Sequence, residues 1–290
     1  MTARRLPADT ASIFLKGLCM GICDIIPGVS GGTIALITGI YERLITAISN
    51  FRPSALLHLI RWDKDALIDD FKAVDPLFLI TLVAGIGVAA LAMSHLILLL
   101  LEQFAVGTYS FFFGLIIASS VLIFLEVETE DRSWKTTLSV LAGFVIGFFI
   151  AGLSPTSLGH SLPVLFFTGM IALCAMILPG ISGAYITLLF NQYEYLLAAV
   201  KALSLPEMAA YIIGGVTGLL LFSRALKYLL RHYHAVMLSL LTGLMLGSTR
   251  MLWRTIGIEG GFGTIAAVCT VAGAIIIVLF EVGKRKMLAA

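Results

Sequence analysis

Pro-Gly-Val-Ser-Gly-Gly, at residues 27–32, interrupts an apolar stretch that extends over residues 12–50. A near copy, Pro-Gly-Ile-Ser-Gly at residues 179–183, interrupts a second apolar stretch, 163–200. Proline followed by glycine ends a helix, and the arms beside each interruption are too short to cross a bilayer comfortably. Non-helical backbone at membrane depth is tolerated only where protein or a water-filled cavity satisfies its polar groups. Each stretch is therefore predicted to be a re-entrant hairpin, which enters and leaves the membrane on the same side.

The remainder of the 290-residue chain has the composition of a membrane protein. Hydrophobic residues make up 59% of the chain and charged residues 12%, about half the ~25% that is typical of soluble domains. The six further segments that are apolar enough to cross a bilayer are 76–101, 104–125, 136–153, 207–229, 234–252 and 262–281. We therefore predict an all-α, multi-pass membrane protein, which excludes soluble enzymes and nucleic-acid-binding proteins.

The two interruptions belong to an internal repeat. A shift of 152 residues aligns nine identities within residues 27–45, and it pairs Glu42 with Glu194. Each half of the chain, 1–155 and 156–290, then holds one hairpin and three spans. Because three crossings are an odd number, the second half is predicted to be upside down relative to the first. Inverted repeats with broken helices at the midplane are typical of secondary transporters.

The basic residues predict the orientation in the membrane. Of the 19 arginines and lysines, 16 fall on one side of the predicted topology and three (Lys201, Arg250 and Arg254) on the other. By the positive-inside rule, the first side, with both termini, faces the cytoplasm. No signal peptide is recognised. The four cysteines are Cys19, Cys23, Cys174 and Cys269. We interpret them as small buried residues, and we expect no metal or other cofactor.

Each interruption can form an anion-binding loop. Glycine allows the backbone to approach a ligand closely, and the helix that restarts after the turn presents unpaired N–H groups and the positive end of its dipole. Serine and threonine hydroxyl groups add further donors. The predicted anion-binding residues are Pro27, Gly28, Ser30, Gly31, Gly32, Thr33, Pro179, Gly180, Ser182 and Gly183. A glycine hinge that only lets the hairpins pack is the alternative interpretation.

The first loop also admits an enzyme interpretation. Gly-Val-Ser-Gly-Gly, at residues 28–32, fits the G-x-S-x-G elbow of hydrolases, and Gly-x-Ser-Gly resembles a motif of intramembrane serine proteases. The elbow requires a preceding strand, which a helical chain does not provide. A serine protease requires a histidine base, for which His95 and His160 are the candidates. Because a nucleophile need not be duplicated, the repeated loop favours a transporter over an enzyme.

The motifs resemble those of a known family. Gly-Leu-Cys-Met-Gly-Ile-Cys-Asp-Ile-Ile-Pro-Gly-Val-Ser-Gly-Gly-Thr-Ile-Ala, at 17–35, with Gly-Ile-Tyr-Glu at 39–42, is similar to the signature of the PopT family of bacterial polyprenyl-phosphate transporters. Residues 178–183 and 192–194 resemble its second signature. The resemblance implies a flippase in the bacterial inner membrane, which returns undecaprenyl phosphate, the lipid carrier of cell-wall synthesis, to the cytoplasmic leaflet. A transporter or channel for a small inorganic anion is the alternative.

Charged residues within or near the membrane supply the last expectations, because intramembrane charge is costly and commonly functional. A phosphate monoester carries nearly two negative charges, so a cation is expected to accompany it. Arg224, beside the cytoplasmic exit, is the first candidate, and Arg250 would serve the outer side, with snorkelling to lipid headgroups as the alternative for both. The candidate proton carriers are Asp24, Glu42 and Glu194. For the glutamates, bracing of the hairpins, through Arg43 or Arg52 in the case of Glu42, is the alternative.

Overall fold

The computed structural model describes residues 7–26, 29–51 and 64–289, and these residues form helices and their connections. Two predicted loop residues, Pro27 and Gly28, lie outside the described residues. The all-helical prediction is confirmed for the part of the chain that is described.

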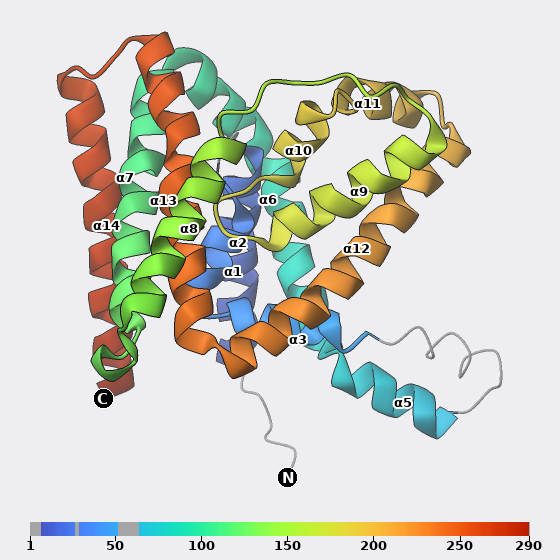
Figure 1. Ribbon diagram of the computed structural model, residues 1–290, viewed down its shortest axis with the longest axis horizontal. Helices are drawn as coiled ribbons and strands as arrows, with labels where there is room; N and C mark the ends of the chain where they lie inside the picture. The colour runs from blue at the N-terminus through green and yellow to red at the C-terminus, as the bar shows by residue number, and fades with distance from the viewer. Residues whose placement is uncertain (1–6, 27–28, 52–63, 290) are drawn as a thin grey trace.

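The first half begins with a broken hairpin. Helix α1 (Pro7–Ile25) runs from the lower face in Figure 1 to the middle of the molecule, where the short α2 (Gly31–Ile37) lies. Helix α3 (Tyr41–Ser49) returns to the lower face. The elements that follow are α5 (Lys64–Ala73), α6 (Pro76–Gln103), α7 (Ala105–Glu126), η1 (Thr129–Asp131) and α8 (Trp134–Ile150).

The second half has the same order of elements but begins at the upper face. Helix α9 (Leu162–Ile177) runs from that face toward the middle, and the short α10 (Gly183–Leu189) follows the second interruption. Helix α11 (Tyr193–Lys201) lies along the upper face. The three long helices that follow are α12 (Leu205–His232), α13 (His234–Glu259) and α14 (Thr264–Ala289).

Within the described residues, five helices are long and apolar enough to cross a membrane, namely α6, α7, α12, α13 and α14. The sixth predicted span, 136–153, corresponds to α8, which has only 17 residues. A capping box between Ser133 and Thr136 fixes the start of α8, and its C-cap is Ala151. These findings support a multi-pass membrane protein whose sixth apolar helix is shorter than predicted.

Glycines bring the first arm of each hairpin against the long helix that follows it. Gly17 on α1 and Gly85 on α6 lie at one such contact, and Gly169 on α9 and Gly214 on α12 lie at the other. A Cβ atom on any of the four would lie 1.9–2.4 Å from a backbone carbonyl oxygen of the partner helix. Since only glycine permits this approach, α1 packs along α6 in the first half and α9 along α12 in the second.

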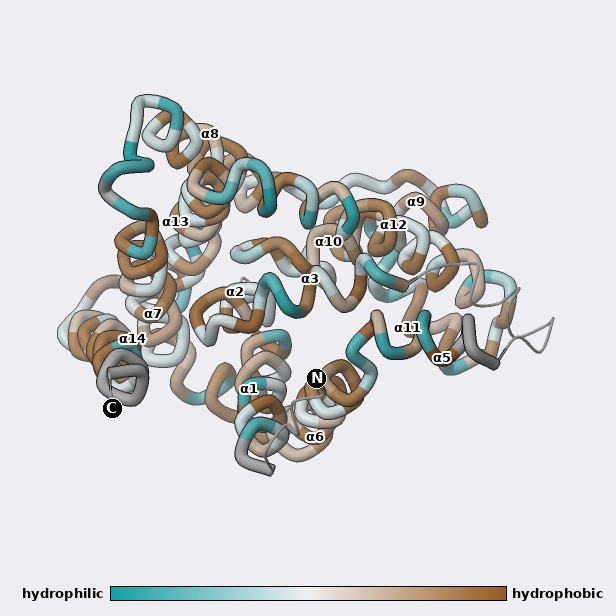
Figure 2. The backbone as a smooth tube through the Cα atoms, turned by 90° about the horizontal axis from the view of Figure 1, so that it is seen from below, coloured by the Kyte–Doolittle hydropathy of each residue, from teal (hydrophilic) through white to brown (hydrophobic). Residues whose placement is uncertain are grey.

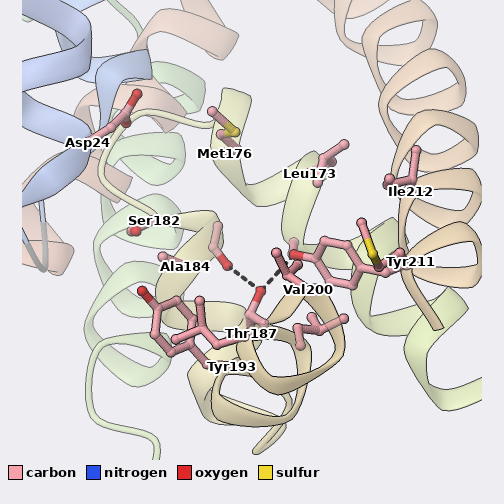
Figure 3. A pocket seen from close by; sticks show the side chains of 15 residues that line it. Asp24, Leu173, Met176, Ser182, Ala184, Thr187, Tyr193, Val200, Tyr211 and Ile212 are labelled. Atoms are coloured by element: carbon pink, nitrogen blue, oxygen red, sulfur yellow. Dashed lines mark hydrogen bonds between the residues drawn. The ribbon is translucent and has the colours of Figure 1, made fainter. Parts of the chain in front are cut away.

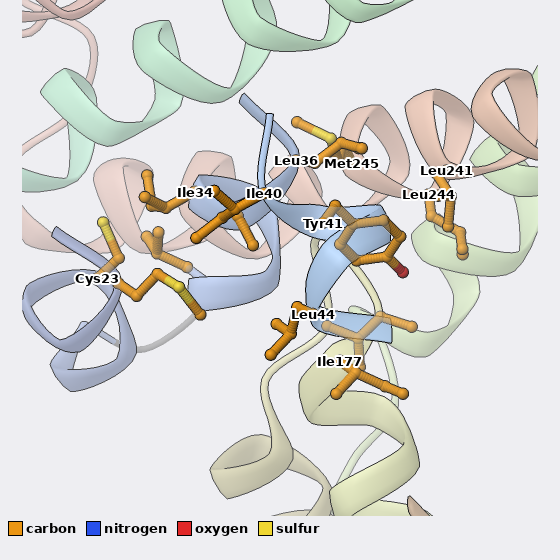
Figure 4. Close-up of a cluster of buried hydrophobic side chains, with 14 of the residues drawn as sticks. Cys23, Ile34, Leu36, Ile40, Tyr41, Leu44, Ile177, Leu241, Leu244 and Met245 are labelled. Atoms are coloured by element: carbon orange, nitrogen blue, oxygen red, sulfur yellow. The ribbon is translucent and has the colours of Figure 1, made fainter. Parts of the chain in front are cut away.

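The core lies where the first hairpin meets α9 and α13. Figure 4 shows Cys23, Ile34, Leu36, Ile40, Tyr41 and Leu44 of this hairpin with Ile177 of α9 and Leu241, Leu244 and Met245 of α13. Apolar residues also cover the outside of the molecule. Leu91 on α6 is 87% exposed and Ile265 on α14 is 68% exposed. Figure 2 shows hydrophobic residues over most of the backbone and hydrophilic ones mainly at turns and helix ends, as expected for helices surrounded by lipid.

Candidate functional site

The two interruptions, which are paired by the sequence repeat, are neighbours in space. The Ser30 hydroxyl donates a hydrogen bond to the Leu178 carbonyl oxygen, at 3.3 Å. The Gly180 N–H donates to Thr33 Oγ1, at 3.0 Å. Ser30 is 1% exposed and Thr33 is fully buried. Hydroxyl groups that were predicted to bind an anion therefore join the two loops in this structure.

The first loop is filled by the chain's own side chains. The Gly31 N–H donates to Asp24 Oδ1 at 2.6 Å, and Ser30, the N-cap of α2, accepts from the Gly32 N–H at 3.2 Å. A carboxylate at the start of a helix satisfies an unpaired N–H and complements the helix dipole. Asp24 thus lies where an anion was expected at the first loop.

The second loop faces a cavity of about 370 Å³ between α9, α10, α11 and α12. Asp24 and Ser182 lie on one side of it, and Tyr211 of α12 lies on the other (Figure 3). Thr187 Oγ1 is 2.9 Å from the Tyr211 hydroxyl and donates to the Gly183 carbonyl oxygen at 3.0 Å. The apolar lining consists of Ala172, Leu173, Met176, Ala184, Leu196, Leu197, Val200, Met208 and Ile212.

This cavity combines a polar end with apolar walls. Ser182 is the N-cap of α10, but its hydroxyl caps no backbone N–H, so the donors that open the helix are left for a ligand. The carboxylate of Asp24 borders the same end and would repel an anion unless it carried a proton. An amphipathic anion with an apolar tail matches this division of the walls.

Two polar residues of the cavity, Thr187 and Tyr211, were not found by sequence reasoning. Thr187 lies one helical turn after Gly183, inside an otherwise apolar segment. Tyr211 belongs to α12, which reaches the cavity only because the glycine contact at Gly169 and Gly214 brings α9 and α12 together. Thr187 could be seen in the sequence as a hydroxyl residue of the second apolar stretch. That Tyr211 lies beside it could not, because the packing of α9 against α12 brings them together.

The two arginines proposed as counter-charges, Arg224 and Arg250, do not line this cavity. Arg224 Nη2 donates to the Phe51 carbonyl oxygen at 2.9 Å, near the lower face. Arg250 Nη1 donates to the Phe148 carbonyl oxygen at 2.9 Å, and its guanidinium lies 4.1 Å from the centre of the Phe148 ring. Their role as counter-charges stays a prediction.

Glu42 and Glu194 lie in the first turns of α3 and α11. Glu42 Oε1 is 2.8 Å from His234 Nε2, and both side chains are more than half exposed. Arg43, the neighbour expected to brace Glu42, instead pairs with Asp75 at 2.9 Å. Of the three predicted proton carriers, only Asp24 lines this cavity, and the role of all three stays a prediction.

The surroundings of the two loop serines differ from those of a serine nucleophile. His160 Nδ1 lies 2.9 Å from Gln192 Oε1, and His95 is exposed on α6. Among the described residues, no hydrogen bond joins a histidine to Ser30 or Ser182. The described part of the chain also holds no group of three or more His, Cys, Asp or Glu residues that could bind a metal ion.

Comparison with known proteins points to one family. A model of the undecaprenyl phosphate translocase-like family matches residues 20–259. A polyprenyl-phosphate transporter of Vibrio cholerae is 43% identical over 242 residues, which cover 83% of this chain and 77% of that protein. A polyprenyl-phosphate transporter of Staphylococcus aureus is 32% identical over 251 residues, which cover 81% of this chain and 83% of that protein. Among solved structures, none matches the chain significantly.

Proposed function

The chain belongs to the undecaprenyl phosphate translocase-like family, and on that premise we propose that it transports a polyprenyl phosphate across the bacterial inner membrane. The cavity beside the second loop carries this proposal, because it is polar at one end and apolar along its walls. An isoprenoid phosphate likewise has a polar headgroup and an apolar chain. The headgroup would lie at Ser182 and Gly183, and the first isoprene units would lie along Leu173 and Leu197.

The headgroup site is proposed to use the second loop first. Ser182 keeps a free hydroxyl at the start of α10, and a phosphate accepts strong hydrogen bonds from such donors. The proposed contacts of this loop are Pro179, Gly180, Ser182 and Gly183. Ser30, Gly31, Gly32 and Thr33 would bind the headgroup in a second conformation, after Asp24 has released the Gly31 N–H.

We propose that the hairpins are re-entrant and that the halves are inverted repeats. In support, α1 and α3 share the lower face, and α9 and α11 share the upper face (Figure 1). Helix α3 packs against α12, whereas its counterpart α11 makes no comparable contact with α6 in the described residues. Helix α3 is thus held against the long helix of the other half, whereas α11 is not. Exchange of these two arrangements would carry the site from one face to the other, which is alternating access.

The charge distribution supports a proposed orientation in the membrane. The C-terminal end of α12, which carries Arg224 and Arg231, and the connection between α7 and α8, which carries Arg132, lie at the lower face (Figure 1), and we therefore assign this face to the cytoplasm. The cavity would then take the headgroup from the outer leaflet and return the lipid carrier to the cytoplasmic leaflet for cell-wall synthesis. An inside-negative potential opposes this step by roughly 2.3 kcal/mol per charge per 100 mV. A proton carried by Asp24 would reduce that opposition, with Glu42 and Glu194 as the alternative carriers.

A transport assay in proteoliposomes tests the proposal. The purified chain should move a fluorescent polyprenyl phosphate between leaflets, and excess inorganic phosphate should not compete. Ala184→Phe should reduce the rate at least tenfold, because Ala184 lines the cavity and the larger ring would fill it. Leu188→Phe, on the same helix and 44% exposed, lies outside the lining and is the matched control.

Full transport by the Ala184→Phe variant would place the route elsewhere. Equal competition by inorganic phosphate would favour the transporter of a small anion, which does not need the apolar walls.

A further inference from the structure

A second pocket lies at the lower face, where the ends of α3 and α12 meet. Its volume is about 410 Å³, and its residues are Ser49, Asn50, Arg224, Lys227, Tyr228, Arg231 and His232. The three permanent cations of this set come from α12 at spacings of three and four residues, which puts them on one side of the helix. The volume is within the usual range of small-ligand sites, roughly 300–1,000 Å³.

Neutral groups hold two of these cations in place. Arg224 Nη2 donates to the Phe51 carbonyl oxygen at 2.9 Å, and Lys227 Nζ donates to Asn50 Oδ1 at 2.7 Å. Among the residues that the structure describes, no carboxylate forms an ion pair with Arg224, Lys227 or Arg231. In this part of the molecule, the positive charge of the pocket is therefore not balanced by an acidic side chain.

General rules account for only part of this cluster. Cations near the C-terminal end of a helix complement its dipole, and cytoplasmic faces are rich in lysine and arginine. Neither rule requires three cations to line one cavity, and like charges three or four residues apart repel one another. A bound phosphate monoester, with about −1.5 to −2 charges near neutral pH, would relieve that repulsion.

Helix α12 connects this pocket to the upper cavity. Tyr211 and Ile212, near the start of α12, line the upper cavity, and Arg224 lies in the lower pocket. Arg224 lies thirteen positions after Tyr211 on the helix, which corresponds to ~20 Å along the axis. The two sites therefore lie at different depths along α12.

We propose that the lower pocket is a second phosphate site, which binds the phosphate monoester headgroup of the transported lipid after it has crossed. Arg224 and Arg231 can each offer two parallel N–H donors to phosphate oxygens, and Lys227 adds a compact charge. The ring of His232, stacked on Tyr228 with centroids 4.2 Å apart, forms one wall. This inference rests on the proposed function, because it assigns the site at which the same substrate leaves.

Binding of radiolabelled farnesyl phosphate to the full chain in nanodiscs of zwitterionic lipid tests the site. All variants carry Ala184→Phe, so that the upper cavity is blocked and the lower pocket is measured alone. Adding Lys227→Gln and Arg231→Gln should weaken binding at least tenfold. The matched control is Lys135→Gln, which removes an exposed cation at the start of α8, on the same face, and should change binding less than twofold.

Competitors identify the ligand. Farnesol, which has no phosphate, should not displace the label. Displacement by inorganic phosphate at similar concentrations would keep the phosphate site but assign it to free phosphate. Displacement by phosphatidylglycerol with equal potency, or unchanged binding in the Lys227→Gln, Arg231→Gln variant, would overturn the site.

The transport assay separates the two proposals. If Ala184→Phe stops transport while Lys227→Gln with Arg231→Gln, in an otherwise wild-type chain, binds and transports normally, the lower site is wrong and the proposed function stands. If the wild-type chain transports no polyprenyl phosphate but charge-dependent phosphate binding persists, the proposed function is wrong and the pocket remains a phosphate site.

Discussion

The two hairpins share one motif but differ in what fills it. In the first hairpin, the carboxylate of Asp24 accepts the Gly31 N–H, and Ser30 is buried between the loops. In the second hairpin, the residue aligned with Asp24 is Met176, and Ser182 borders a cavity. The same turn can therefore be closed by a carboxylate of the chain or left open to a ligand, and the exchange of Asp24 for Met176 is one of the differences between the two copies.

The difference continues into the helices that follow the turns. Tyr41, at the start of α3, is 1% exposed, whereas its counterpart Tyr193, at the start of α11, is 39% exposed and lines the cavity. Helix α3 packs against α12, but α11 has no comparable contact with α6 among the described residues. The hairpins thus show two arrangements of one motif within a single structure, which suits a transporter that alternates between them.

The largest effect is expected where the two halves agree, at their glycine contacts. Gly214→Val would place a Cβ atom 1.9 Å from the Phe166 carbonyl oxygen, and Gly85→Val would place one 2.4 Å from that of Phe14. Because backbone must move in both cases, each change should lower the free energy of unfolding by more than ~3 kcal/mol, the upper end of overpacking effects. Thermal unfolding in detergent measures this. Gly87→Val is the control, since its Cβ atom would meet nothing within 4 Å.

A loss of stability in one half only would contradict the equivalence of the two contacts. In that case the comparison between the hairpins would no longer rest on a shared framework.

The next effect concerns the residue that distinguishes the hairpins. Asp24→Asn keeps an oxygen that can accept the Gly31 N–H but removes the charge, and a charge-assisted hydrogen bond is about twice as strong as a neutral one. The free energy of unfolding should fall by about 1–2 kcal/mol. Because Asp24 is the proposed proton carrier, transport should also stop responding to a pH gradient imposed across proteoliposomes. A variant that still follows the gradient would leave Glu42 and Glu194 as the carriers.

The reciprocal substitution at the aligned position of the second hairpin tests whether the headgroup lies at the open loop. Met176→Asp would place a carboxylate near Gly183, at the open loop, where like charge opposes a phosphate. Binding of polyprenyl phosphate should weaken more than tenfold, and Met176→Asn, which adds a polar group without charge, is the control. Unchanged binding would show that the headgroup does not lie at the second loop.

The sequence predicted the breaks in both hairpins because a Pro-Gly step and its flanking apolar arms are local features. It placed the sixth span at 136–153, two residues late at its start and three residues too long at its end, because hydropathy marks neither the capping box at Ser133 nor the end of the helix at Ile150. Asp24 was noticed as an ionisable residue one turn before Pro27. Its bond to Gly31 depends on how the chain folds back after α1, which local patterns do not specify.

The candidate site was predictable only in part for the same reason. Two nearly identical motifs cannot reveal which one is closed, because closure depends on contacts of α3 with α12 that are distant in sequence. Tyr211 likewise comes to the cavity from another helix.

Alanine at the two loop serines should affect different properties, stability at Ser30 and ligand binding at Ser182. Ser30→Ala removes the N-cap of α2 and the donor to the Leu178 carbonyl oxygen, so the free energy of unfolding should fall by about 1 kcal/mol. Ser182→Ala should leave stability within ~0.5 kcal/mol and weaken binding of polyprenyl phosphate by about 2- to 13-fold, equivalent to ~0.5–1.5 kcal/mol. Unfolding and binding are measured on both variants, with threonine at each position as the control that keeps the hydroxyl. Equal effects of both alanines on binding would mean that the two loops are used together.

The smallest effect separates the paired tyrosines. The Tyr41 hydroxyl is buried and has no hydrogen-bond partner among the described residues, so Tyr41→Phe removes a polar group that costs free energy in this arrangement. The free energy of unfolding should stay unchanged or rise by up to ~1 kcal/mol.

That gain in stability would apply only to the conformation in which Tyr41 is buried. If the second conformation exposes Tyr41 as this one exposes Tyr193, a gain of ~1 kcal/mol shifts the equilibrium about fivefold toward the structure described above, and transport should slow by a similar factor. Tyr193→Phe, whose ring already faces the cavity, should change neither stability nor that equilibrium, and Tyr233→Phe, 54% exposed at the lower face, is the control. Unfolding and transport rates are compared across the three variants. A loss of stability in Tyr41→Phe would show that the hydroxyl is hydrogen-bonded in the resting protein, and the first hairpin would then not be the closed member of the pair.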